Sequence, residues 1–221
     1  MRIRVSMSCG IYYWGRKMEQ YQDYVIKDGQ FIGKFEEMYQ KFDDPWHQTI
    51  QVGQSYSRHA TLLSLKLLQA KSVLEVGCGL GYFTDYMTRS LPEISITGLD
   101  LSETAVKKAK KRFPDLNFVA GNVCDYLAAP RAYDTIILSE IMWYILDDLD
   151  TIIRLLSENF AGKNLIINQS FYKSGQLYGA EYFTTLQQMT AYLPFEMKRA
   201  MEVDCAEKSS TEAHAVFEIK I

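Results

Sequence analysis

The sequence has few residues of the kinds that build disulfide frameworks or metal centres. Its four cysteines (Cys9, Cys78, Cys124 and Cys205) are far apart and form no C-x-x-C pair, and its three histidines are equally scattered. This spacing fits reduced thiols better than disulfides, and it argues against a structural metal site. We therefore expect a protein without a metal ion and with the free thiols that are typical of the cytoplasm.

Long apolar runs and an excess of basic charge are also missing. No segment approaches the roughly 20 apolar residues that span a bilayer, and the charged N-terminus MRIRVSMSCGIYYWGRK is not followed by the apolar run of a secretion signal. The formal charge of −3 gives a large polyanion no general attraction to the surface. We expect a soluble, cytoplasmic protein that acts on a small molecule, with no nucleic acid or membrane as its partner.

The chain divides into an N-terminal covering segment and one larger domain. Its 221 residues, 48% of them hydrophobic, are enough for a single sizeable core. Residues 1–52 are rich in aromatic and charged residues but show little periodicity, so we interpret them as a lid over a domain of residues 53–221. Met18 begins an equally plausible chain, so residues 1–17 are a candidate start-site extension.

From Ser55 onward, helical and strand patterns alternate. The stretch SRHATLLSLKLLQA has leucines at helical spacing, and short runs such as KSVLEVG, ISITGLD and AYDTIILSE read as buried strands. This alternation predicts an α/β fold with a parallel sheet and helices on both faces. The last two strand-like runs, FEMKRAMEV and AHAVFEIKI, have only a short polar connection, which favours an antiparallel pair.

The motif EVGCGLG contains three glycines at the junction of a strand and a helix. Gly77, Gly79 and Gly81 let the backbone approach a ligand closely, and Asp100 ends the next strand, where a carboxylate can accept both hydroxyls of a ribose. The spacing is neither the G-x-G-x-x-G of dinucleotide-binding proteins nor a phosphate-binding loop. Three alternatives stay open: glycines that serve packing only, Asp100 as a helix cap, and an NAD-dependent oxidoreductase with a variant loop.

With Glu75 placed two residues before these glycines, the sequence resembles the class I S-adenosylmethionine-dependent methyltransferases from about Tyr56 to the C-terminus. The resemblance implies a Rossmann-like, doubly wound, mostly parallel seven-stranded sheet with an antiparallel C-terminal strand. It also implies S-adenosylmethionine as the cofactor. Carried over position by position, it assigns the cofactor to Glu75, Gly77, Gly79, Gly81, Asp100, Leu101, Asn122, Val123 and Ser139. Here Asn122 stands where the family usually has a carboxylate that faces the adenine.

The stretch FDDPWHQ, residues 42 to 48, is similar to a D-P-W segment of small methyltransferases related to the nodulation-factor N-methyltransferases and to some deoxysugar methyltransferases. There the segment folds over the cofactor. The likeness implies that Trp46 flanks the cofactor and that Arg58 pairs with its carboxylate, for which an arginine fork is well suited. The alternative is that Trp46 only covers the sheet edge and Arg58 is solvated.

The fourth strand ends in SEIMWY, residues 139 to 144, and its tip is expected beside the transferable methyl group. Glu140 is the first candidate for a general base and His47 the second, although a glutamate at a strand end can also be a cap or an ion-pair partner. The motif [ND]-P-P-[YFW] of amide and base methyltransferases is absent here, which argues against exocyclic amines of bases as acceptors.

Together these features predict an enzyme that methylates a hydroxyl or an amine of a small polar metabolite, such as a carbohydrate or a nucleotide-sugar. The aromatic and amide side chains of NQSFYKSGQLYGAEYFTT, after the fifth strand, suit such an acceptor but would equally suit a lid. The alternative is a catalytically silent protein that keeps the fold to bind the cofactor or a partner.

Overall fold

The structure, a computed structural model, describes residues 12–13, 16–17, 20–129 and 131–220. Cys9 and the candidate start at Met18 lie outside the described residues. Within these ranges, no helix has the length and apolarity needed to cross a bilayer. The same part of the chain contains no group of three His, Cys, Asp or Glu side chains arranged to hold a metal ion, and Cys78, Cys124 and Cys205 are free thiols.

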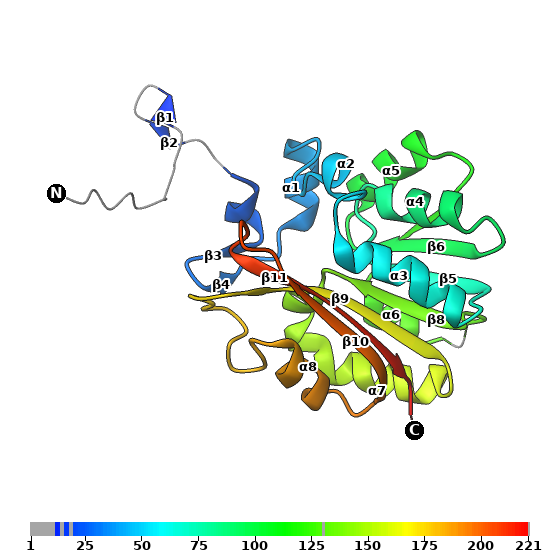
Figure 1. The fold of residues 1–221 in the computed structure, drawn as a ribbon. Helices are drawn as coiled ribbons and strands as arrows, with labels where there is room; N and C mark the ends of the chain where they lie inside the picture. Colours follow the sequence, from blue (N-terminus) through cyan, green and yellow to red (C-terminus); the bar gives the residue numbers. More distant parts are fainter. Residues whose placement is uncertain (1–11, 14–15, 18–19, 130, 221) are drawn as a thin grey trace.

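A seven-stranded sheet forms the centre of the molecule (Figure 1). Its spatial order is β10-β11-β9-β8-β5-β6-β7, and the neighbours from β9 to β7 pair in parallel, whereas β11 is antiparallel to both β9 and β10. The strands are β5 (Ser72–Val76), β6 (Ser95–Asp100), β7 (Asn117–Ala120), β8 (Thr135–Ser139), β9 (Asn164–Tyr172), β10 (Glu196–Asp204) and β11 (Ser210–Glu218). The predicted mostly parallel sheet with an antiparallel C-terminal strand is confirmed.

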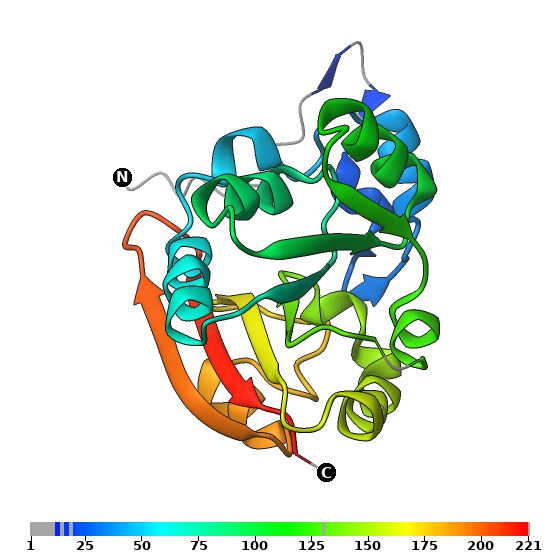
Figure 2. The ribbon, with the colours of Figure 1, turned by 90° about the vertical axis from the view of Figure 1, so that its right-hand side faces the viewer.

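Helices cover both faces of this sheet, as Figure 2 shows. They are α3 (Tyr56–Leu67), α4 (Tyr82–Ser90), α5 (Glu103–Arg112), α6 (Val123–Leu127), α7 (Leu149–Phe160) and α8 (Leu186–Tyr192), with the 3₁₀ turns η2 (Met142–Tyr144) and η3 (Leu146–Asp148). Apolar side chains of α3 and α4 form one buried cluster against the strands, and those of α6, α7 and α8 form another. Because both faces are buried, the central strands are mostly apolar, with polar residues such as Glu75 and Asp100 near their carboxyl ends.

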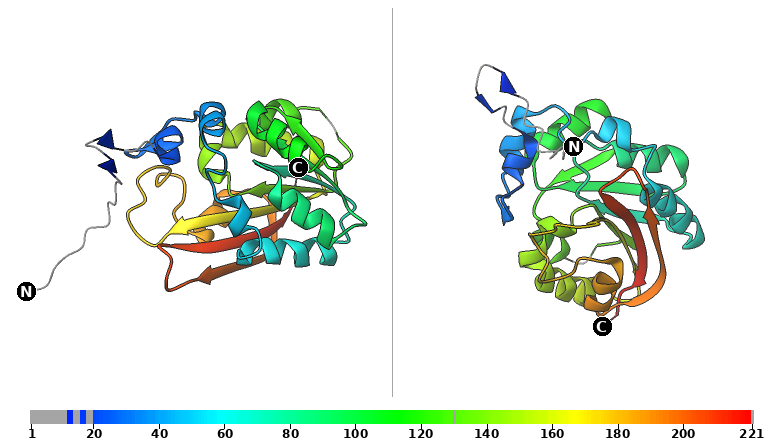
Figure 3. Two further views of the ribbon diagram at one scale, coloured as in Figure 1. Left: turned by 90° about the horizontal axis from the view of Figure 1, so that it is seen from above. Right: turned by 60° about the vertical axis from the view of Figure 1, so that its left-hand side comes forward.

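From Tyr21 to Gln51 the N-terminal segment consists of short elements that lie at one end of the sheet, whereas the two short strands before residue 20 stand away from it (Figure 3). The elements of the segment are β1 (Tyr12–Tyr13), β2 (Arg16–Lys17), η1 (Tyr21–Tyr24), β3 (Ile26–Lys27), β4 (Gln30–Phe31), α1 (Phe35–Lys41) and α2 (Gln48–Gln51).

Two charged side chains join α1 to α5. Glu36 accepts hydrogen bonds from the Oγ of Ser102 (2.6 Å) and the N–H of Thr104 (3.1 Å). Burial would raise the pKa of Glu36, but these hydrogen bonds outweigh it and lower the pKa to about 2. On the other side, Lys108 Nζ donates to the backbone oxygens of Tyr39 and Phe42. The segment is therefore held over the start of α5.

A buried polar network connects α3 with the antiparallel part of the sheet. His214 on β11 is 3% exposed, and its Nδ1 contacts Asn168 Oδ1 at 2.8 Å while its Nε2 contacts Ser64 Oγ at 2.8 Å. These partners fit a neutral imidazole that donates from Nδ1 and accepts at Nε2. Burial lowers the pKa of His214 to about 4.

The lowered pKa predicts that His214 makes folding pH-dependent. In the unfolded chain His214 is protonated below its ordinary pKa near 6.5, whereas in the folded protein it stays neutral until about pH 4. The free energy of unfolding therefore decreases as the pH falls from about 6.5 to about 4. Between pH 7 and pH 4.5 the loss from this group is about 2 kcal/mol. Urea unfolding at both pH values gives the free energy of unfolding of the wild type and of His214→Gln, and the difference between their pH dependences is the contribution of His214. The buried carboxyl groups with raised pKa values stabilise the fold at low pH, but they do so in both proteins and cancel in this difference. The exposed His59 serves as the control in His59→Gln, and equal pH effects in all three proteins would rule this account out.

Candidate active site

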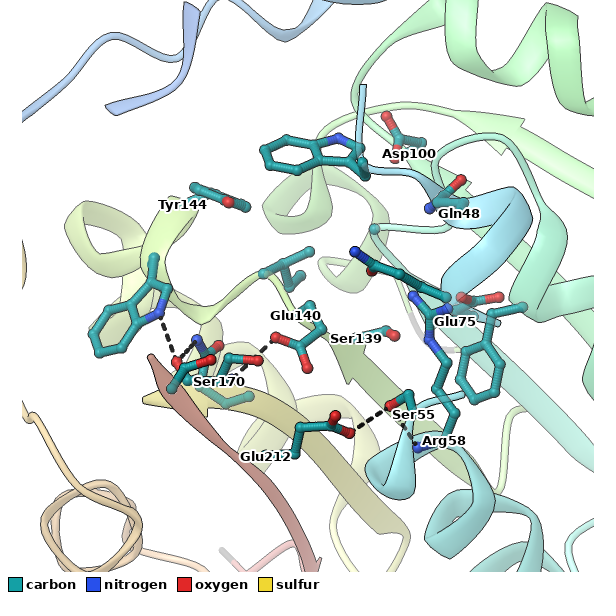
Figure 4. Close-up of a pocket in the computed structure, with 18 of the residues that line it drawn as sticks. Gln48, Ser55, Arg58, Glu75, Asp100, Ser139, Glu140, Tyr144, Ser170 and Glu212 are labelled. Atoms are coloured by element: carbon teal, nitrogen blue, oxygen red, sulfur yellow. Dashed lines mark hydrogen bonds between the residues drawn. The ribbon is translucent and has the colours of Figure 1, made fainter. Parts of the chain in front are cut away.

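A cavity of about 480 Å³ lies where β5, β6 and β8 end, under the N-terminal segment. Parallel strands bring their carboxyl ends to one edge of the sheet, so residues far apart in sequence meet there. The predicted site residues that line this cavity are Trp46, Arg58, Glu75, Gly77, Asp100, Ser139 and Glu140. Figure 4 shows carboxyl, guanidinium and hydroxyl groups at the cavity that come from α3 and from the strands β5, β6, β8, β9 and β11.

Arg58 is the cation at the centre of this site. It lies in the first turn of α3 and is 7% exposed, with its guanidinium 5.3 Å from the ring centre of Phe83. Burial lowers the pKa of Arg58, and the carboxylates of Glu140 and Glu75 oppose this effect. Its Nη1 is buried and has no hydrogen-bond partner. An unpaired buried donor is costly, so this nitrogen is suited to a carboxylate of a bound ligand.

Glu75 and Asp100 supply two buried carboxyl groups. Glu75 is 1% exposed and accepts a hydrogen bond from Thr84 Oγ1 (2.5 Å), and burial raises its pKa to about 7. Asp100 accepts from the N–H groups of Gly79 (2.8 Å) and Ser102 (2.9 Å), and burial raises its pKa to about 6. The side chain that caps α5 is Ser102, not Asp100. Each Asp100 oxygen keeps a lone pair for a further donor, such as a ligand hydroxyl.

The three glycines of the loop have different surroundings. Gly77 lines the cavity, and a Cβ on it would lie 2.1 Å from Ile141 Cγ2, so only glycine fits. Gly79 is covered by the N-terminal segment, because a Cβ there would lie 2.7 Å from both Tyr39 Oη and Gln48 Nε2. Gly81 packs toward Phe118. Of the three, Gly77 is the one that the structure places at the cavity.

The stretch after Asp43 is seated directly on the glycine loop. Asp44 accepts from the N–H groups of Gln48 (2.8 Å) and Thr49 (3.1 Å) and so caps α2. Gln48 Oε1 then accepts from the N–H of Leu80 at 2.8 Å. Sequence reasoning singled out Trp46 and His47 in this stretch and missed Gln48, for which the only signal was its place at the end of FDDPWHQ.

Trp46 and His47 are neighbours in sequence but have different positions. The indole of Trp46 lines the cavity, with ring centres of Tyr21 at 5.0 Å and Tyr144 at 5.8 Å. His47 is exposed, has a left-handed backbone with φ 51° at the start of α2, and does not line the cavity. His47 as a base therefore stays a prediction, and its exposed position favours Glu140 over it.

Glu140 follows β8 directly and faces the cavity (Figure 4). Its backbone has φ 59°, an uncommon conformation for a glutamate that often marks functional sites. The N–H of Ser170 donates to Glu140 Oε2 at 3.0 Å and fixes the carboxylate. Burial raises the pKa of Glu140, although Arg58 and Ser170 oppose it. A raised pKa and a fixed carboxylate suit a general base.

Two polar groups from β9 and β11 complete the site: Gln169, from the amide-rich stretch that was expected to suit an acceptor, and Glu212, which was not foreseen. Gln169 is 1% exposed, and its Nε2 donates to the Ser170 oxygen, which leaves the buried Oε1 without a partner. Glu212 is 6% exposed, accepts from Ser55 Oγ at 2.9 Å, and pairs with Lys208. The sequence had placed Glu212 in the polar connection before the last strand, whereas β11 begins at Ser210, and no motif marked Glu212 as part of a site.

The residues predicted to contact an adenine lie outside the cavity lining. Leu101 is 55% exposed, and Asn122 is an exposed N-cap whose Oδ1 accepts from the N–H of Cys124 at 2.7 Å. Val123 is buried in the apolar core. Their contact with an adenine stays a prediction.

Comparison with known proteins agrees with this architecture. A family model described as a methyltransferase domain matches residues 73–159, the part that contains the glycine loop, Asp100 and Glu140. The N-methyltransferase NodS from Bradyrhizobium japonicum, solved in complex with S-adenosylhomocysteine, has a TM-score of 0.59 at 19% identity, with 82% of this chain and 96% of that chain covered. Residues 73–159 therefore match a methyltransferase domain, and the fold around them is that of the class I S-adenosylmethionine-dependent methyltransferases.

Other proteins similar to this chain extend the comparison. A TehB-like methyltransferase from Corynebacterium glutamicum has a TM-score of 0.60 at 18% identity, covering 83% of this chain and 99% of that one. In sequence, trans-aconitate 2-methyltransferase of Afipia carboxidovorans is 30% identical over 94 residues, and phthiotriol/phenolphthiotriol dimycocerosates methyltransferase of Mycobacterium tuberculosis is 39% identical over 84 residues. The alignments span 42% and 37% of this chain but only 36% and 30% of those relatives.

Proposed function

We propose that this protein transfers the methyl group of S-adenosylmethionine to a hydroxyl or an amine of a small polar acceptor, namely a carbohydrate or a nucleotide-sugar. The observation that carries the proposal is the partnerless, buried Nη1 of Arg58. It lies in one cavity with Gly77, Asp100 and Glu140, so a group for each part of the reaction is present.

The cavity has the groups needed to hold the cofactor. Arg58 pairs with the carboxylate of the cofactor, and Asp100 accepts hydrogen bonds from its ribose hydroxyls. The Gly77 backbone leaves room for the methionine part, and Glu75 and Ser139 line the cavity beside it. Trp46 flanks the cofactor, and the proposed contacts with its adenine are those of Leu101, Asn122 and Val123. When bound, S-adenosylmethionine supplies a methyl group that is already activated by its sulfonium, so the protein mainly has to align the acceptor and exclude water.

Glu140 is the group that we propose to take the proton of the acceptor. A hydroxyl oxygen or an ammonium nitrogen is a poor nucleophile until that proton leaves. The carboxylate is fixed by the Ser170 N–H and faces the cavity from the end of β8. The partnerless Gln169 Oε1 lines the same cavity and can accept a hydrogen bond from the same substrate.

The lining supports a polar, ring-shaped acceptor. Tyr21, Tyr144 and Tyr172 line the cavity together with Gln169. Aromatic rings pack against the apolar faces of sugar rings, while amides and hydroxyls bind their polar edges. This combination is the basis for choosing a carbohydrate.

Methyl transfer can be tested before the acceptor is known. The protein is incubated with S-adenosylmethionine that carries a labelled methyl group and with a small-molecule extract of the organism that encodes the chain. We expect one or a few labelled small molecules that depend on the protein. Binding of the cofactor without any labelled product would instead identify a catalytically silent binding protein.

We also propose that the N-terminal segment is a lid that closes on the cofactor. Trp46 and Gln48 line the cavity, so a ligand there adds contacts to α2 that stabilise it. At a hundredfold excess of S-adenosylhomocysteine over its Kd, backbone amide exchange in residues 43–51 is expected to slow by up to about 100-fold. Hydrogen exchange followed by mass spectrometry measures this, with the β10–β11 hairpin as the internal reference. Equal exchange with and without the ligand would make the segment a static packing element.

A further inference from the structure

A second cavity of about 330 Å³ continues from the first. The two share a wall of aromatic residues: Tyr21, Trp46, Trp143, Tyr144 and Tyr172. The second cavity lies between the N-terminal segment and the loop after β9, residues 173–185, which lie side by side in Figure 3. Gly29 and Leu177 meet there, since a Cβ on Gly29 would be 3.1 Å from Leu177 Cβ. Its lining includes none of Arg58, Gly77 or Asp100.

The two cavities differ sharply in charge. The first is lined by two cationic and four acidic side chains: Arg58, Lys208, Glu75, Asp100, Glu140 and Glu212. Among the residues that the structure describes, no charged side chain lines the second cavity. A phosphate or carboxylate that entered it would lose its hydration without gaining a counter-charge, which is strongly unfavourable.

One residue that lines the second cavity, Gln176, has a polar atom that is buried and unpaired. Gln176 Nε2 donates to the backbone oxygens of Tyr178 (3.3 Å) and Phe183 (3.2 Å), which fixes the orientation of the amide. Gln176 Oε1 has no hydrogen-bond partner. An acceptor that is left unpaired among aromatic rings is suited to an O–H or N–H group of a bound molecule.

We infer that the second cavity holds the non-reacting part of the methyl acceptor, and that this part is an uncharged, ring-containing group with an O–H or N–H donor for Gln176. The inference rests on the proposed function and narrows the class of methyl acceptor. Of the proposed acceptors, it selects an uncharged glycosyl group and excludes the nucleotide of a nucleotide-sugar from this cavity. The acceptor therefore extends from Glu140 across the shared aromatic wall.

Charge fractionation of the extract tests the class of acceptor. The extract is passed through an anion exchanger at pH 7, and both fractions are incubated with the protein and methyl-labelled S-adenosylmethionine. We expect labelled product from the unbound fraction. Product from the retained, anionic fraction alone overturns the inference and leaves the proposed methyl transfer intact. No product from either fraction overturns both.

Charge-changing variants test the position of the subsite. Gln176→Leu removes the unpaired oxygen and Gln176→Lys adds a cation, so with the unbound fraction both are expected to raise KM for the acceptor about tenfold, while kcat and the Kd for S-adenosylhomocysteine change little. If the bound group were anionic, Gln176→Lys would lower KM instead. Leu177→Lys, at the exposed rim of the same cavity, provides a second variant with the same expected direction.

The matched control is Gln187→Lys, which adds the same charge to the exposed surface of α8 outside both cavities. It is expected to leave KM unchanged. An unchanged KM in all of the Gln176 and Leu177 variants, with cofactor affinity retained, would exclude the second cavity as an acceptor subsite.

Discussion

Replacing Glu140 with glutamine is expected to lower the rate of methyl transfer by about 100- to 10,000-fold, the usual contribution of a general base. The substitution keeps the shape of the side chain and an oxygen that can accept the Ser170 N–H, but it removes the basicity. Affinity for S-adenosylhomocysteine is expected to stay nearly constant, because Glu140 acts on the acceptor. The measurement is a single-turnover experiment with the labelled cofactor and the acceptor fraction identified above.

His47→Asn is the comparison variant for this experiment. His47 is exposed and lies outside the cavity lining, so this change is expected to alter the rate by no more than a few fold. If Glu140→Gln transfers the methyl group at nearly the wild-type rate, the base assignment is wrong. Alignment alone would then be sufficient, as for an acceptor that arrives already deprotonated.

The second large effect is expected for cofactor binding on replacement of Arg58. Arg58→Met keeps much of the packing on Phe83 but removes the donor whose Nη1 has no partner within the protein. Loss of hydrogen bonds to a charged group costs about 1.5 to 3 kcal/mol, so the Kd for S-adenosylhomocysteine should rise about 10- to 150-fold. Isothermal titration calorimetry measures it.

Arg89→Met is the matched control, because Arg89 is an exposed arginine on α4 that pairs with Asp85 four residues away and does not line the cavity. It should bind the ligand as the wild type does. Arg58→Lys keeps the positive charge next to Glu75 and Glu140 but removes the guanidinium. If its affinity for the ligand falls as in Arg58→Met, the loss is due to the missing guanidinium hydrogen bonds and not to the missing charge. Wild-type affinity in Arg58→Met would remove Arg58 from the cofactor site.

The parts of the site that could be predicted are those with a signal in a short stretch of sequence. A strand followed by glycines identified Gly77, and the ends of the next strands identified Asp100 and Glu140, because parallel strands bring their carboxyl ends together. The parallel sheet of the α/β fold was predicted because each strand has its own apolar run and these runs alternate with helical patterns. The polar tail connection predicted the antiparallel pairing of β10 and β11.

The rest of the site depends on tertiary contacts that no local pattern contains. Gln169 and Glu212 lie within strands and face the cavity only because β9 and β11 pair in one particular register. Gln48 reaches Leu80 across 32 positions of sequence, after Asp44 has fixed α2. Gly79 and Gly81 match the motif as well as Gly77 does, yet their surroundings are set by Tyr39, Gln48 and Phe118.

The most direct test of the whole account is a calorimetric titration of the wild-type protein with S-adenosylhomocysteine. We expect saturable binding of one ligand per chain, with competition by S-adenosylmethionine for the same cavity. Absence of binding by a folded protein at millimolar ligand would contradict it, because the buried Arg58 and Asp100 would then serve the fold alone.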